Sequence, residues 1–117
     1  MKEVESLEQL HARFVLHFWA TYGGGTLLPS QLRGLAIPEF DCPMDGQEAS
    51  ITVGNLLKAE AVSDQFTKYL RRCYKQDSNW WLFDIHPAPP FGRSNFVQIR
   101  EMIEQKLAKI LMEEKAA

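Results

Sequence analysis

The sequence predicts an α-rich α+β fold, in which three amphipathic helices pack around a short aromatic strand. Apolar residues recur at helical spacing within 7–22, 53–75 and 95–113, as expected for helices that bury one face. Residues 79–85 are instead aromatic, β-favouring and too few for a comfortable helix, which predicts a strand. A small sheet of two or three strands is compatible with this pattern.

The composition fits one globular domain over residues 1–117. Hydrophobic residues make up 45% and charged residues 24% of the chain, which excludes a disordered composition. The net charge of −2 comes from interspersed acids and bases, unlike the basic face of a general nucleic-acid or anionic-membrane binder. The sequence shows neither a membrane-length apolar run nor a signal-peptide pattern. We therefore expect a cytoplasmic protein that does not enter a membrane, with Cys42 and Cys73 as free thiols.

Start signals support the expected helices. Ser6 and Gln9 have capping-box spacing at the beginning of the first helix. Ser63 is a suitable cap for a helix over 64–75, which forms the second part of the helical region. The helix over 95–113 is expected to bury a stripe made of Phe96, Ile99, Ile103, Leu107, Ile110 and Leu111.

The apolar residues within 23–50 follow neither the helical nor the strand period. Prolines and glycines interrupt this segment, and a structureless loop of this length is uncommon inside a compact domain. The segment therefore contains short elements that the pattern hides, or it forms a working surface. Residues 50–57 are ambiguous, because Ile51 and Val53 alternate with polar residues as in a strand, whereas Thr52 could cap a helix. We favour a helix from residue 53 onward.

The aromatic segment is the first candidate for a functional surface. On a strand its apolar side chains point to both faces, and a domain this small has few residues to cover both. The prolines within 87–93 stiffen the loop that follows, so it loses little entropy on binding. A buried central strand would explain the tryptophans equally well. We predict a partner-binding site made of Trp80, Trp81, Phe83, Phe91 and Arg93.

Residues 52–72 offer an alternative, because two helices joined by a tight turn form a helix-turn-helix. The segment resembles the helix-turn-helix of MerR-type regulators and excisionases, with Val53-Gly54-Asn55-Leu56-Leu57-Lys58 followed by Ala61-Val62-Ser63. That resemblance implies DNA contacts from the second helix, through Gln65, Thr67, Lys68, Arg71 and Arg72. It departs from the pattern in three places: Ala61 stands for the turn glycine, Leu57 for a small residue and Thr67 for an apolar one.

These observations rank three functions. The first is a small non-enzymatic protein-binding module, an adaptor, inhibitor or accessory subunit that acts by occupying the surface of another protein; a homodimer is also compatible with the sequence. The second is a DNA-binding regulator or recombination accessory protein that uses residues 52–72. The third is a small enzyme or metal protein centred on Asp84 and His86, which share one face of the predicted strand. The sequence provides no basis for assigning a catalytic residue, a metal or a cofactor.

Overall fold

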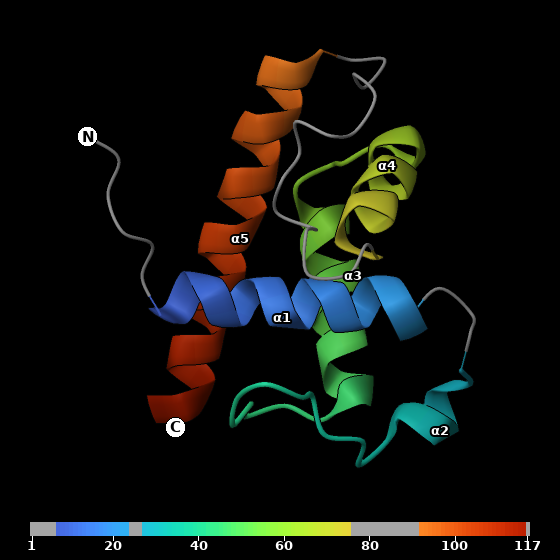
Figure 1. Cartoon of the computed structure of the whole chain (residues 1–117), viewed down its shortest axis with the longest axis vertical. Coiled ribbons are helices and arrows are strands. Elements are labelled where there is room, and N and C mark those ends of the chain that lie inside the picture. Colours follow the sequence, from blue (N-terminus) through green and yellow to red (C-terminus); the bar gives the residue numbers. More distant parts are fainter. Residues whose placement is uncertain (1–6, 24–26, 76–91, 117) are drawn as a thin grey trace.

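The computed structural model describes residues 7–23, 27–75 and 92–116. These residues form helices and no strand (Figure 1). The predicted α+β class is therefore wrong, and the described part of the chain is all-helical. The strand predicted over 79–85 lies outside the described residues. The helices are α1 (Leu7–Tyr22), α2 (Pro29–Leu32), α3 (Gly46–Ala59), α4 (Asp64–Lys75) and α5 (Arg93–Ala116).

Residues 50–57, which were compatible with a strand, belong to α3. Its buried residues Ala49, Val53, Leu56 and Leu57 follow a helical period once the count begins before residue 50. The N-cap is Asp45, whose Oδ1 accepts a hydrogen bond from the Glu48 amide at 2.9 Å. Helix α3 thus begins seven residues before the start favoured from the sequence, within the stretch expected to be irregular.

Helix α1 is the centre of the fold. It packs against α3, α4 and α5, and Figure 1 shows it crossing in front of α3 and α5. The bounds of α1 and α4 coincide with those expected from the sequence, whereas α5 is longer than expected at both ends. The core lies where these helices meet, and its most buried apolar side chains include Val15, Leu16, Trp19, Val53, Leu70, Phe96, Ile103 and Leu107.

A tight turn joins α3 to α4. The Val62 amide donates to the Leu57 carbonyl at 3.1 Å and the Ala61 amide to the Lys58 carbonyl at 3.0 Å, which is the hydrogen-bond pattern of a Schellman motif. The position that favours glycine in this motif is occupied by Ala61, with a φ of 56°. Ser63 then caps α4, since its Oγ accepts from the Phe66 amide at 3.1 Å.

No helix in the described ranges combines the length and the apolar character needed to cross a bilayer.

Candidate functional site

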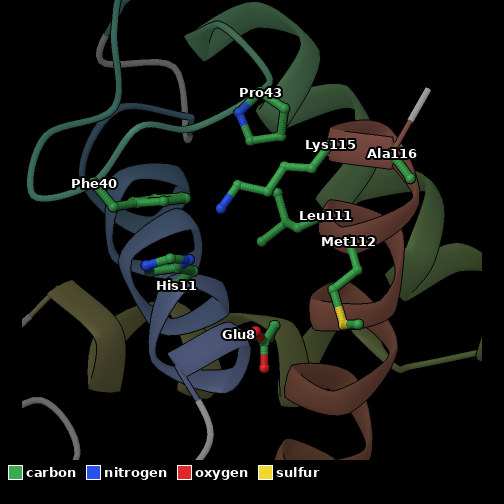
Figure 2. A pocket seen from close by; sticks show the side chains of 8 residues that line it. All are labelled: Glu8, His11, Phe40, Pro43, Leu111, Met112, Lys115 and Ala116. Atoms are coloured by element: carbon green, nitrogen blue, oxygen red, sulfur yellow. The ribbon is translucent and has the colours of Figure 1, made fainter.

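A pocket opens where the N-terminal half of α1, residues 40–43 and the C-terminal end of α5 meet (Figure 2). Its volume is about 290 Å³. Segments far apart in the sequence therefore line one concave surface. The lining residues are Glu8, His11, Phe40, Pro43, Leu111, Met112, Lys115 and Ala116.

One wall of the pocket is a stacked pair of rings. The His11 and Phe40 ring centroids lie 4.2 Å apart with an interplanar angle of 18°. Phe40 also lies near Phe14, with a centroid distance of 6.1 Å, so the Phe40 ring packs against two residues of α1. Glu39 has a φ of 77°, which turns the chain immediately before Phe40.

The wall is uncharged at neutral pH. Burial lowers the pKa of His11 below its ordinary value of 6.5, and the positive charge of Lys115 lowers it further, while Glu8 acts in the opposite direction. A neutral imidazole therefore faces the pocket at pH 7, and the stacked pair presents an apolar surface to any group that enters.

Helix α5 provides the rest of the surface. Leu111 is buried, whereas the next residue, Met112, keeps 51% of its surface exposed. In Figure 2 the Lys115 side chain extends toward the Phe40 side of the pocket, and Glu8 lies at the other end. The pocket thus combines an apolar middle with a cation and a carboxylate at opposite ends, an arrangement suited to binding an apolar side chain flanked by charged groups.

The partner-binding residues predicted from the sequence lie almost entirely outside the described part. This applies to Trp80, Trp81, Phe83 and Phe91, and also to Asp84 and His86 of the third hypothesis. Arg93 is the first residue of α5, but its side chain is not among those described. The pocket of Figure 2 is a separate surface, and of its lining only Phe40 and Pro43 lie in the segment 23–50 for which a working surface was one of two expectations.

The residues of the DNA-binding alternative all lie on α4. Gln65, Lys68 and Arg72 are exposed, whereas Thr67 is half-buried. Arg71 lies over Trp19, with its guanidinium carbon 4.1 Å from the ring centroid, and its Nη1 donates to the Trp19 carbonyl at 3.0 Å.

A cleft of about 280 Å³ lies between α3 and α4. Leu57 and Thr67 both line it. These are two of the three positions that depart from the helix-turn-helix pattern, where a small residue and an apolar residue would let the two helices pack closely. At the third, the turn, Ala61 adopts the left-handed conformation that a glycine would take.

The described residues contain no cluster of three or more His, Cys, Asp and Glu side chains able to hold a metal ion. Burial raises the pKa of the Cys42 thiol and raises that of Cys73 to about 11. Both cysteines are free and carry protonated thiols at pH 7, which makes them weak nucleophiles.

Two features of the sequence relate to the residues that line the pocket. Met112 and Lys115 follow the buried stripe of the last helix but lie off it, and Phe40 is the only aromatic residue within 23–65. Neither feature shows that the two ends of the chain meet, so periodicity alone could not locate the pocket.

Comparisons of the chain with protein-family models, with curated proteins and with solved structures found no match.

Proposed function

We propose that this chain is a non-enzymatic protein-binding module, which docks a short peptide segment of another protein in the pocket between α1 and α5. The observation that supports it most is the apolar pocket with a half-exposed Met112 at its rim. Aromatic residues and methionine are enriched in protein interfaces, and the flexible thioether of methionine adapts to different apolar partners. An adaptor, an inhibitor or an accessory subunit would act through such a surface.

The charges at the two ends define the chemistry of the partner segment. Lys115 favours an acidic side chain near the Phe40 side, and Glu8 favours a basic or amide donor at the other end. Between them an apolar side chain would contact the His11–Phe40 wall and Met112. The expected ligand is therefore a short segment with one apolar anchor between an acidic and a basic residue.

Peptide selection tests the proposal. A peptide library is displayed on phage, peptides that bind the purified chain are selected, and their dissociation constants are measured by fluorescence anisotropy. Met112→Glu places a charge in the apolar rim and is expected to weaken the selected peptides at least tenfold, which corresponds to about 1.4 kcal/mol. Lys115→Glu is expected to weaken peptides that carry an acidic residue.

Ile51 offers a matched control. It is an apolar residue on α3 with 56% of its surface exposed, close to the value for Met112, and it does not line the pocket. Ile51→Glu should leave peptide affinity within about twofold of wild type, and thermal unfolding should show that both variants fold. Equal losses in the two variants would contradict the proposal. Self-association of the chain that Met112→Glu abolishes would also contradict it, because the occupant would then be a second copy.

A further inference from the structure

We propose that the exposed face of α4 is a second binding surface, which contacts the phosphate backbone of duplex DNA. It carries three cations, Lys68, Arg72 and Lys75, at spacings of four and three residues. All three are exposed, and residues at these spacings share one face of a helix. This surface is independent of the pocket between α1 and α5.

The opposite face of α4 fixes the orientation of the cations. Its buried residues are Phe66, Leu70, Cys73 and Tyr74, and α4 packs against α1. The three cations therefore point away from the core. Within the described ranges none of them forms an ion pair. The one carboxylate of α4, Asp64, lies one turn before Lys68.

The charge of the chain is distributed unevenly. Residues 64–75 contain four of the 13 lysines and arginines but only one of the 15 acidic residues. This segment has a net charge of +3 in a chain whose total is −2. A local positive potential over α4 would attract a polyanion despite the acidic total, because at physiological salt the field of the distant acids is screened beyond about 8 Å.

The two adjacent arginines of α4 have different positions. Arg71 lies on Trp19 and donates to its carbonyl, so it is half-buried and contributes to the packing of α4 on α1. Arg72 is exposed. Separate substitutions of the two arginines therefore distinguish a loss of packing from a loss of DNA binding, since only Arg72 belongs to the exposed face.

Duplex DNA fits the shape of this surface. An α-helix is about 10–12 Å wide with its side chains, and the major groove of B-DNA is about 12 Å wide. The turn at Ala61 separates α4 from α3. Gln65 lies in the first turn of α4 and is exposed. In this arrangement Lys68, Arg72 and Lys75 contact phosphates, and Gln65 lies toward the base edges.

Three phosphate contacts predict weak, salt-dependent binding. The logarithm of the association constant should fall with the logarithm of salt concentration with a slope of about −2.7. Affinity would be in the range of non-specific DNA binding, with a dissociation constant of roughly 1–100 μM.

The test is fluorescence anisotropy of a labelled duplex with the full chain at low and at physiological salt. The variant K68Q/R72Q/K75Q removes the three cations and is expected to lose affinity at least tenfold and to lose the salt dependence. A matched control, R33Q/K106Q/K109Q, removes three exposed cations outside α4 and outside the pocket, and changes the net charge by the same amount. Its affinity is expected to stay within about threefold of wild type, since only distant charges change.

Three results would overturn the proposal: no duplex binding at low salt, equal losses in the two triple variants, or equally tight binding to single-stranded DNA and to anionic vesicles. Circular dichroism of both variants verifies that they fold. R71A should lower the unfolding temperature, while R72A should lower DNA affinity and leave the unfolding temperature nearly unchanged. The proposal would also be overturned if R71A lowered DNA affinity at an unchanged unfolding temperature while R72A lowered the unfolding temperature and left DNA affinity unchanged.

Discussion

Arg13 and Glu104 are 91 residues apart in the sequence, yet the Arg13 Nε lies 3.2 Å from both carboxylate oxygens of Glu104. The same buried carboxylate accepts hydrogen bonds from Arg100 Nη1 at 3.1 Å, from Gln9 Nε2 at 3.1 Å and from the Tyr74 hydroxyl. Glu104 has no exposed surface. One carboxylate thus connects α1, α4 and α5 in the interior of the fold.

Glu104→Gln is expected to destabilise the chain by about 3–5 kcal/mol, because it leaves the buried Arg13 and Arg100 guanidinium groups without their shared counter-charge. Urea unfolding followed by circular dichroism measures the change. Glu113→Gln is the matched control, since Glu113 is exposed on the same helix and should cost less than about 0.5 kcal/mol. Similar losses in the two variants would show that the buried ion pairs contribute little.

Tyr74→Phe is expected to cost about 1.5–3 kcal/mol, the usual value of a hydrogen bond to a charged group. The ring stays buried, so the loss comes from the hydroxyl that donates to Glu104. Tyr22→Phe provides the comparison, because Tyr22 is 37% exposed and water can replace its hydrogen bonds. Chemical denaturation of both variants measures the difference. An unchanged free energy of unfolding in Tyr74→Phe would mean that the remaining donors satisfy the carboxylate.

The stability of the chain should fall as the pH rises above 9. Burial raises the pKa of the Cys73 thiol from its ordinary value of 9.0 to about 11. A raised pKa in the folded state favours the protonated form, so the contribution is complete below pH 9 and is lost as the pH rises toward 11. For a thiol that is 1% exposed, the expected loss is about 1–1.5 kcal/mol by pH 10 and about 2–3 kcal/mol once the pH exceeds 11.

Unfolding in urea at pH 8, 9 and 10 measures this decline. Cys73→Ala should flatten the curve between pH 9 and 10, whereas Cys42→Ala should change it less, because Cys42 is only half-buried. The pKa of buried Tyr74 is also raised, chiefly by desolvation and then by Glu104, so a further decline is expected above pH 10 in each of these proteins. A curve for Cys73→Ala as steep as that of wild type would contradict the assignment.

Local signals were sufficient for the helices that bury one apolar face. The stripe of α1 and the Ser63 cap of α4 place these helices at their observed bounds. The sequence predicts a later start for α3 because the alternation of Ile51 and Val53 masks its helical period, although Asp45 and Glu48 have the spacing of an N-cap and its first turn. The Asp45 cap, and not the apolar period, marks the residue at which α3 begins.

The buried carboxylate and the pocket depend on long-range packing. Glu104 adjoins Ile103 on the buried face of α5, but a sequence does not show which residues of other helices will neutralise it. The pocket likewise needs His11 of α1 to meet Met112 of α5. Periodicity identifies a buried face and does not identify its neighbours, so neither feature could be derived from the chain alone.

Ala61→Gly is expected to stabilise the chain by about 0.5–1 kcal/mol. The left-handed conformation of Ala61, with a φ of 56°, costs an L-residue about 1–2 kcal/mol, and the greater freedom of glycine in the unfolded chain offsets part of this gain. Ala36→Gly is the control, since Ala36 is an exposed loop residue without a positive φ and its replacement should be neutral or slightly destabilising. Urea unfolding of both variants measures the difference. A loss of stability in Ala61→Gly would show that the turn between α3 and α4 does not hold this residue in the left-handed conformation in solution.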